Sequence, residues 1–217
     1  MYHPTTPIPN TGSLSHSLFN QLRADILQGK LKPGEKLTEQ RVCSEYVVSR
    51  TPVREAFQKL ENDGLIETIP NRGAFVVGVT DRDIQDMYEL RKAYEAIAVR
   101  WAIQRITDEE FQALQEAYEF MEFYTMKKDI EKMLNINMQF HQLIYNAAHN
   151  RMLLHTLTNF QIYTKQRRGN KTYADNYLEE VLSEHQEIFQ AFVSKDEDAA
   201  AAAITKHLDN AKRRANF

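Results

Sequence analysis

The sequence lacks several features that other classes of protein need. Its single cysteine, Cys43, cannot form a disulfide within the chain and fits a reducing compartment. No apolar run approaches the roughly 20 residues of a transmembrane helix, and residues 1–13 have neither the basic start nor the apolar core of a signal peptide. These absences predict a soluble, cytoplasmic protein that does not enter a membrane, with a flexible N-terminal tail over residues 1–13.

Neither sign of charge dominates the chain, so charge alone gives no case for nucleic acid. The formal net charge is −3, and residues 1–79 hold 9 Lys and Arg against 8 Asp and Glu. Glycine and proline are almost absent from residues 80–217, where Gly169 is the only glycine and there is no proline. The chain therefore divides into two parts. Since the net charge gives no case for DNA binding, any such case must rest on the local placement of cationic residues.

Residues 14–79 contain three helical patterns followed by two short strands. An amphipathic helix covers residues 14–28, and LKPGEKL follows it as a predicted turn. Thr38 is suited to cap a second helix, and Ser49 a third helix with Pro52 in its first turn. LIETI and AFVVGV then flank the turn PNRG. Three helices followed by a hairpin predict a winged helix-turn-helix.

The third helix has two different faces. Val53, Ala56, Phe57 and Leu60 form its apolar stripe. A rotation of about 100° per residue places the opposite face at Thr51, Arg54, Glu55 and Gln58. Side chains of these types reach phosphates and base edges in a major groove, and a helix N-terminus attracts phosphate. A surface helix with ordinary charges is the alternative, but Arg72 at the hairpin tip adds a second arginine where DNA would lie.

The stretches PGEKLTEQ, VSRTPVREAFQKLENDGLIE and NRGAFV closely resemble the DNA-binding domain of GntR-family bacterial transcription regulators. The resemblance covers about residues 14–79. It implies that Arg50, Thr51 and Arg54 contact operator DNA and that Arg72 and Gly73 form the wing contact. Ser49 at the helix start and Gln58 on the exposed face complete the predicted DNA-binding set. Val47 departs from the family, which often has glycine there.

Residues 80–217 have helical patterns throughout, so the predicted fold class is mainly α. The predicted helices cover residues 81–105, 108–127, 129–149, 151–168, 174–194 and 196–214. The aromatic residues fall at helical spacing and are expected in the core. They include Tyr88, Tyr94, Trp101, Phe120 and Phe140.

Three of these helices each carry a histidine within an apolar stripe. His141 follows Asn137 by one turn, and His185 and His207 are surrounded by apolar residues on later helices. A lone histidine on such a face is usually a satisfied core residue. Three together with an amide oxygen could instead share a metal ion, since unpaired buried imidazoles are costly. Such ligands suit Zn, Ni, Fe or Mn. The pattern alone leaves both interpretations open.

Arg91 lies on the buried face of the first of these helices, one turn before Glu95. An internal ion pair between the two is one interpretation. The other is a guanidinium fork that binds a carboxylate effector, with a metal ion holding the same anion.

YELRKAYEAIAVRWA, the N-x-x-x-H spacing of Asn137 and His141, SEHQEIFQAF and KHL resemble the FCD-type ligand-sensing domain of FadR-like regulators, in its shorter, VanR-like six-helix form. The resemblance implies an antiparallel helical bundle that senses a small organic acid at a divalent metal ion. The implied ligands are Asn137, His141, His185 and His207. The family often has aspartate at the first position, and a neutral amide is a weaker ligand. His149 and His155 do not match and are expected to be surface or structural residues.

The sequence thus predicts a transcription regulator, by family default a repressor, that binds a pseudo-palindromic operator as a homodimer. Its effector would be a small carboxylate near Arg91 and the metal. One alternative is a metal-dependent hydrolase in which the three histidines activate water, but no buried carboxylate is free to act as a base. Another is a regulator whose metal is purely structural.

Overall fold

The computed structural model describes residues 13–168 and 173–215, so the predicted tail lies outside the described residues except for Ser13. The described residues form two compact units, one that ends at Thr80 and one that begins at Asp81. The fold is mainly α, as predicted. Among the described residues, no helix is both long and apolar enough to cross a membrane.

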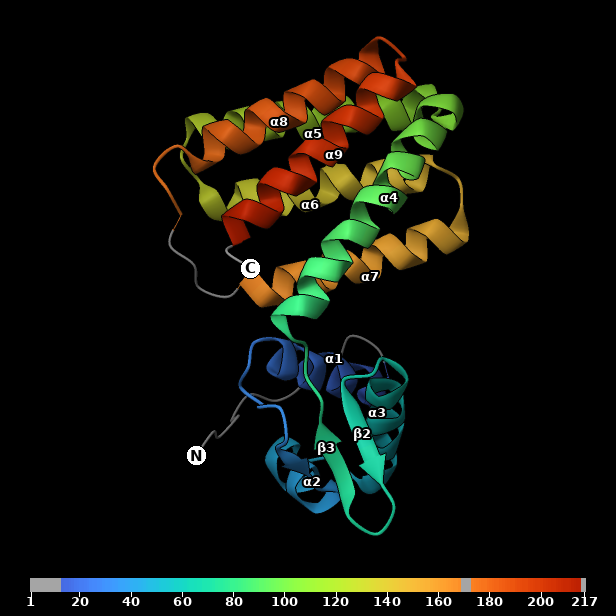
Figure 1. Ribbon diagram of the computed structural model, residues 1–217, viewed down its shortest axis with the longest axis vertical. Coiled ribbons are helices and arrows are strands. Elements are labelled where there is room, and N and C mark those ends of the chain that lie inside the picture. Colours follow the sequence, from blue (N-terminus) through green and yellow to red (C-terminus); the bar gives the residue numbers. More distant parts are fainter. Residues whose placement is uncertain (1–12, 169–172, 216–217) are drawn as a thin grey trace. The chain divides into compact units, whose positions relative to one another are not determined.

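The first unit contains three helices and a small sheet (Figure 1). Its elements are α1 (Leu14–Leu27), β1 (Lys36–Leu37), α2 (Glu39–Tyr46), α3 (Arg50–Asn62), β2 (Ile66–Ile69) and β3 (Gly73–Val76). The predicted hairpin is confirmed as β2 and β3. The turn predicted at LKPGEKL is present, with the backbone N–H of Glu35 donating to the carbonyl of Lys32 at 2.9 Å, but its last two residues form β1, which pairs with β3 and places Lys36 opposite Phe75. A two-residue strand has no periodicity of its own, and its partner lies far along the chain.

Apolar side chains and one buried carboxylate hold the first unit together. Leu18, Leu22 and Ile26 of α1 are buried, as their spacing predicted. The carboxylate of Asp25 is fully buried, where it accepts hydrogen bonds from the hydroxyl of Tyr46 at 2.9 Å and other polar groups. A buried carboxylate is tolerated only with such partners, and the Tyr46 bond joins α1 to α2.

The turn between α2 and α3 sets where α3 begins. Thr38 caps α2, as predicted, by accepting a hydrogen bond from the backbone of Arg41 at 3.2 Å. Val47 then adopts a left-handed backbone with φ of 53°. Ser49 is the N-cap residue of α3, but its side chain makes no capping hydrogen bond.

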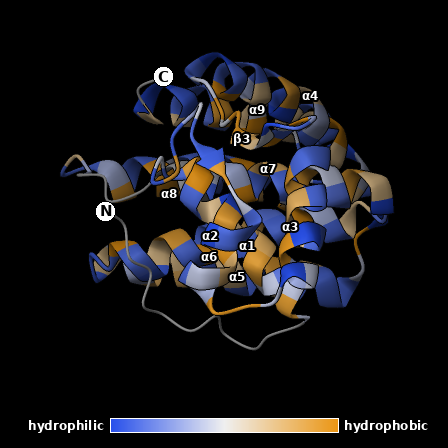
Figure 2. Ribbon diagram, turned by 90° about the horizontal axis from the view of Figure 1, so that it is seen from below, coloured by the Kyte–Doolittle hydropathy of each residue, from blue (hydrophilic) through white to orange (hydrophobic). Residues whose placement is uncertain are grey.

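The second unit is a bundle of helices (Figure 1). Its helices are α4 (Asp81–Arg105), α5 (Asp108–Met126), α6 (Ile130–Ala147), α7 (Arg151–Arg168), α8 (Tyr177–Val193) and α9 (Glu197–Ala215). Their ends lie within three residues of the predicted ones. Helix α4 packs along α6 and α9, and α5 packs against α6 and α8. Polar and apolar residues alternate along the ribbons (Figure 2), as expected of helices with one buried face.

The aromatic residues of the bundle do not all lie in the core. Tyr88 and Phe140 are buried as predicted, but Tyr94 is 38% exposed and Phe120 51% exposed. The prediction was wrong for these two, and Trp101 is only partly buried. Helical spacing identifies residues that share a face, but it does not show whether another helix of the same chain covers that face.

Candidate functional site

Helix α3 presents the predicted polar face to solvent. Val53 and Leu60 are buried against the unit, whereas Thr51, Arg54 and Gln58 are exposed. Ser49 and Arg50 are also exposed at the start of the helix. The N-terminal turn of α3 therefore combines free hydroxyl groups, two guanidinium groups and the positive end of the helix dipole, which is the chemistry that binds phosphate.

Arg54 does not point freely into solvent. Its Nε donates a hydrogen bond at 2.7 Å to Glu39 of α2, although 65% of the Arg54 side chain is exposed. This hydrogen bond lowers the pKa of Glu39. Glu39 thus orients the arginine at the start of α3, a role that the sequence did not suggest because the two residues lie on different helices.

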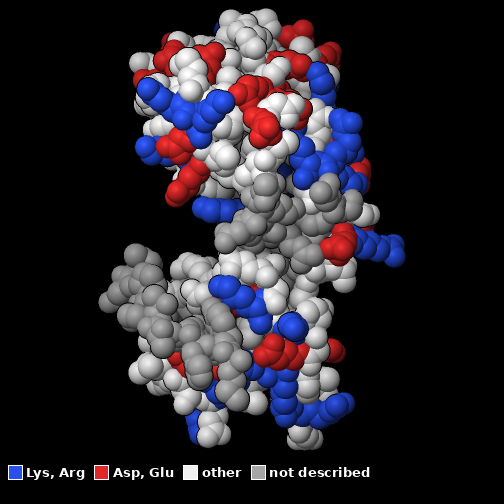
Figure 3. All heavy atoms as spheres, turned by 90° about the vertical axis from the view of Figure 1, so that its left-hand side faces the viewer, with Lys and Arg blue, Asp and Glu red and all other residues white. Residues whose placement is uncertain are grey.

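The wing carries a second group of cations. Arg72 is exposed at the tip. Gly73 has a φ of +96°, a backbone angle that residues with a side chain rarely adopt. The Lys36 ammonium and the Arg72 guanidinium both lie over the ring of Phe75, at 5.9 and 5.7 Å from its centre. Lys36 was missed because β1 was missed. Lys and Arg side chains gather at the end of this unit where Figure 1 has the β2–β3 turn (Figure 3).

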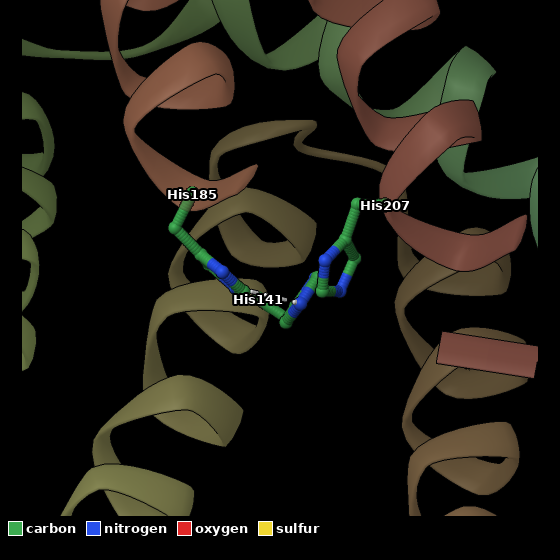
Figure 4. A group of neighbouring side chains, drawn as sticks. All are labelled: His141, His185 and His207. Carbon is green, nitrogen blue, oxygen red and sulfur yellow. Dashed lines mark hydrogen bonds between the residues drawn. The ribbon is translucent and has the colours of Figure 1, made fainter. Parts of the chain in front are cut away.

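In the second unit the three predicted histidines come together from three helices (Figure 4). His141 of α6, His185 of α8 and His207 of α9 are all buried, with exposed fractions of 3%, 0% and 5%. Each offers a nitrogen, and these three atoms lie within 4.8 Å of one another. This separation suits one metal ion shared by three imidazoles.

Hydrogen bonds fix the orientation of two of these rings. Nδ1 of His185 lies 2.7 Å from the backbone carbonyl of Val181, and Nδ1 of His207 lies 2.8 Å from a carboxylate oxygen of Glu184. Carbonyl and carboxylate oxygens only accept, so Nδ1 carries the hydrogen in both rings. Their Nε2 atoms therefore have free lone pairs. Metal-binding histidines commonly donate their second ring N–H in this way.

His141 completes the group. Its Nε2 lies 3.3 Å from Nε2 of His185, and its Nδ1 lies 3.3 Å from Oε2 of Glu95. With its hydrogen on Nδ1, facing the carboxylate, two imidazole lone pairs would face each other. They repel unless a hydrogen or a cation lies between them, so the arrangement fits a bound cation.

Two further oxygens support this fit. Oδ1 of Asn137 is buried and accepts no hydrogen bond from a described residue, and Oε2 of Glu95 is buried with only Nδ1 of His141 near it, at 3.3 Å. Asn137 precedes His141 by one helical turn, so its amide lies on the same buried face of α6. Buried polar atoms without partners are costly, and coordination of a cation is one way to satisfy them.

The surroundings keep His185 and His207 neutral and Glu95 charged. Burial lowers the pKa of His185 well below its usual value and that of His207 to about 4. Burial opposes the charge of Glu95, but the Arg91 guanidinium and His141 together outweigh it and lower the pKa of Glu95 to about 2. Neutral imidazole is the form that binds a metal, so the bundle keeps these two histidines in the form that a metal needs.

Arg91 is buried and already has partners. It donates hydrogen bonds to Glu95 at 2.8 Å and to the hydroxyl of Thr164 at 3.2 Å. The internal ion pair that the sequence allowed is thus present, whereas the role of Arg91 in binding an effector stays a prediction. The hydroxyl of Tyr145 is buried nearby, beside Arg91 and Glu95. His149 and His155 are exposed, as expected.

Two family models match the chain. "Bacterial regulatory proteins, gntR family" matches residues 14–76, and "FCD domain" matches residues 86–210. The chain is a GntR-family regulator with an FCD domain. It is a DNA-binding transcription regulator and not an enzyme, which removes the hydrolase alternative.

Curated relatives of this GntR-family chain span nearly its whole length. It is 30% identical to the uncharacterized HTH-type transcriptional regulator YdhC of Bacillus subtilis, over 88% of this chain and 86% of the relative. It is 29% identical to the HTH-type transcriptional repressor RspR of Escherichia coli, over 95% of this chain and 88% of the relative. E. coli McbR/YncC has the same fold, with a TM-score of 0.73 at 22% identity over 95% of this chain and 98% of that chain.

Proposed function

We propose that this GntR-family regulator is a cytoplasmic repressor that binds operator DNA as a homodimer and releases it when a small carboxylate binds a metal-containing bundle. The predicted DNA contacts are Ser49, Arg50, Thr51, Arg54, Gln58, Arg72 and Gly73. Their support is the exposed, cation-rich start of α3 together with the wing. Relatives that are named repressors, RspR and the gluconate operon repressor of Bacillus licheniformis, support the sign of regulation.

The proposed metal ligands are Asn137, His141, His185 and His207. The observation that supports them most is the convergence of three buried imidazoles, two of which have their Nδ1 hydrogens bonded away from the centre. Zn, Ni, Fe and Mn all suit these ligands. A bound divalent ion would supply positive charge at which an acid anion can bind.

The proposed effector is a small organic acid that binds beside Arg91. Its carboxylate would have to share or replace the bonds that Arg91 makes with Glu95 and Thr164. The buried hydroxyl of Tyr145 is a further hydrogen-bond donor for an anion. To release DNA, the acid must bind the DNA-free arrangement more tightly than the DNA-bound one.

The proposed dimer uses the outer face of α4. Leu90, Tyr94 and Ile97 are 49%, 38% and 39% exposed and follow each other at three- and four-residue spacing. The ring of Tyr94 stacks on Phe160 of α7, with ring centres 6.3 Å apart, so the apolar surface continues onto a second helix. A row of large exposed apolar residues indicates a surface that another protein covers. A second copy of the chain is the partner that a two-fold operator requires.

Measurement of metal content tests the metal site of this proposal. Untagged protein purified without chelator should hold about one metal ion per chain, because each site of this kind binds one ion. The His185→Ala variant should lose it, whereas His155→Ala, which removes an exposed histidine, should keep it. An empty wild type that takes up no added Zn, Ni or Mn would contradict the metal site. Removal of the metal that unfolds the bundle, rather than weakening acid binding, would favour the structural alternative.

The DNA contacts are tested with duplexes that the wild type selects from a random-sequence pool. Arg54→Ala should weaken binding by about 1–3 kcal/mol and relax the sequence preference. Lys59→Ala removes the same charge from the exposed end of α3 and should leave the sequence preference intact. If Arg54→Ala binds with unchanged affinity and preference, α3 does not read the operator as proposed.

A further inference from the structure

Glu184 connects the histidine cluster to the last turns of α9. It lies on α8, one residue before His185, and is itself 7% exposed. One of its carboxylate oxygens accepts the Nδ1 hydrogen of His207 at 2.8 Å. The other accepts a hydrogen bond from the side-chain amide of Asn210 at 2.6 Å.

Arg214, also on α9, fixes the same carboxylate. Its two terminal nitrogens donate to the two oxygens of Glu184, each at 2.7 Å, which is the paired geometry of a bidentate arginine–carboxylate bond. The guanidinium also lies over the ring of Tyr177, 5.8 Å from its centre. Glu184 therefore has little freedom to turn away from His207.

The position of this carboxylate decides which nitrogen of His207 faces the cluster. With the hydrogen of the neutral ring held on Nδ1 by Glu184, the lone pair is on Nε2. Without an acceptor at this place, the hydrogen can move to Nε2, and the ring then has no lone pair on the side of its neighbours. A negative charge at Nδ1 also makes the ring a stronger electron donor.

We infer that Glu184, held by Arg214 and Asn210, is a positioning residue that fixes His207 for metal binding, an inference that rests on the proposed metal site. His185 obtains the equivalent hydrogen bond from the backbone of its own helix, through Val181. His207 has to obtain it from another helix. The metal affinity of the site thus depends on the ion pair between α8 and the C-terminal turns of α9.

Zinc affinity in competition with a chromophoric chelator tests this inference on the full-length chain. Glu184→Ala removes the acceptor and should weaken zinc binding by about 10–100-fold. Glu184→Gln keeps an oxygen that can accept from Nδ1 but loses the charge, so its loss should be smaller and its fold intact. Glu187→Gln is the matched control, since Glu187 also joins α8 to α9, through Lys206 at 2.7 Å, but is largely exposed. It should bind zinc like the wild type.

A spectroscopic measurement separates positioning from a merely structural role. Long-range proton–nitrogen correlation spectra of the zinc-loaded wild type should show the His207 hydrogen on Nδ1. A hydrogen on Nε2, or zinc binding by Glu184→Ala as tight as by Glu187→Gln, would overturn the inference. A wild type that binds no zinc, nickel or manganese would instead refute the metal site itself, and this inference with it.

Discussion

Val47 adopts a backbone conformation that valine avoids. Its φ is 53°, in the left-handed region, and its side chain is 90% exposed and contributes no packing. A left-handed backbone destabilises a residue with a Cβ by about 1–2 kcal/mol, whereas glycine adopts it without this strain. The departure from the glycine that is frequent in this family therefore has an energetic consequence, although the turn itself is formed.

Val47→Gly should raise the free energy of unfolding of the first unit by about 1 kcal/mol, with part of the relieved strain offset by the greater freedom of glycine in the unfolded chain. Thermal or urea denaturation of the full chain measures it. Val48→Gly, one residue later at a position outside the left-handed region, should lower the stability. Equal effects of both substitutions would show that the strain at Val47 is negligible.

The sequence predicts single residues well where one helix decides their place. The exposure of Arg54 and the burial of Val53 follow from rotation along α3 alone. The Glu39–Arg54 bond, the Lys36 side chain at the wing and the Glu184–His207 bond all join different elements. No periodicity within one element can reveal such pairs, because their distances are set by tertiary packing.

At the scale of the element, the helices of the bundle were predictable because their ends carry local signals. Thr107 and Glu110 form a reciprocal capping box at the start of α5, with hydrogen bonds of 3.2 and 2.9 Å. Strand β1 has no such signal. The convergence of α6, α8 and α9 at the histidines also depends on packing between distant segments, so the sequence could propose the shared site but not establish it.

Two of these helices, α8 and α9, carry histidines that make the stability of the metal-free bundle depend on pH. His207 has a folded pKa of about 4, and that of His185 is also well below 6.5. As the pH falls below 6.5, these two histidines bind protons in the unfolded chain but stay neutral in the folded chain. The free energy of unfolding therefore falls towards pH 4. The Glu95 carboxylate, with a folded pKa of about 2, contributes stability that is present above pH 4.5 and lost between 4.5 and 2.

Urea denaturation in the presence of chelator, between pH 6.5 and 5, isolates the histidines from the carboxylates. The free energy of unfolding of the bundle should fall by roughly 1–3 kcal/mol over this interval, since about 1.4 kcal/mol is lost per pH unit and per excluded proton. His185→Phe removes one such proton and should reduce the slope. A flat profile for the wild type would mean that the buried imidazoles accept protons in the folded state.

At the scale of the whole molecule, the exposed apolar row on α4 predicts the assembly. Ile97→Glu places a charge in the centre of the row and should weaken the dimer by at least about 2 kcal/mol, roughly 30-fold, as for a buried interface residue. Sedimentation equilibrium measures the dimer dissociation constant. Operator affinity should fall as well, because the two DNA-binding units that contact the two half-sites are no longer held together.

Phe123→Glu supplies the comparison for that experiment. Phe123 is 45% exposed on α5, slightly more than Ile97 on α4. The same new charge there should leave the dimer intact. If Phe123→Glu dissociates the dimer and Ile97→Glu does not, the chains associate through α5 and the proposed α4 surface is wrong.

The neutral amide of Asn137 has a consequence for the logic of regulation. In the proposed metal site, three neutral imidazoles and an amide would leave both positive charges of a divalent ion uncompensated, since the nearby Glu95 is already balanced by Arg91. An acid anion would supply the missing negative charge. The bound metal ion would therefore raise the affinity for the anion, and the bound anion would raise the affinity for the metal ion. Thermodynamic reciprocity makes the two gains equal. The regulator would then act as a coincidence detector, answering to metal and acid together and only weakly to either alone.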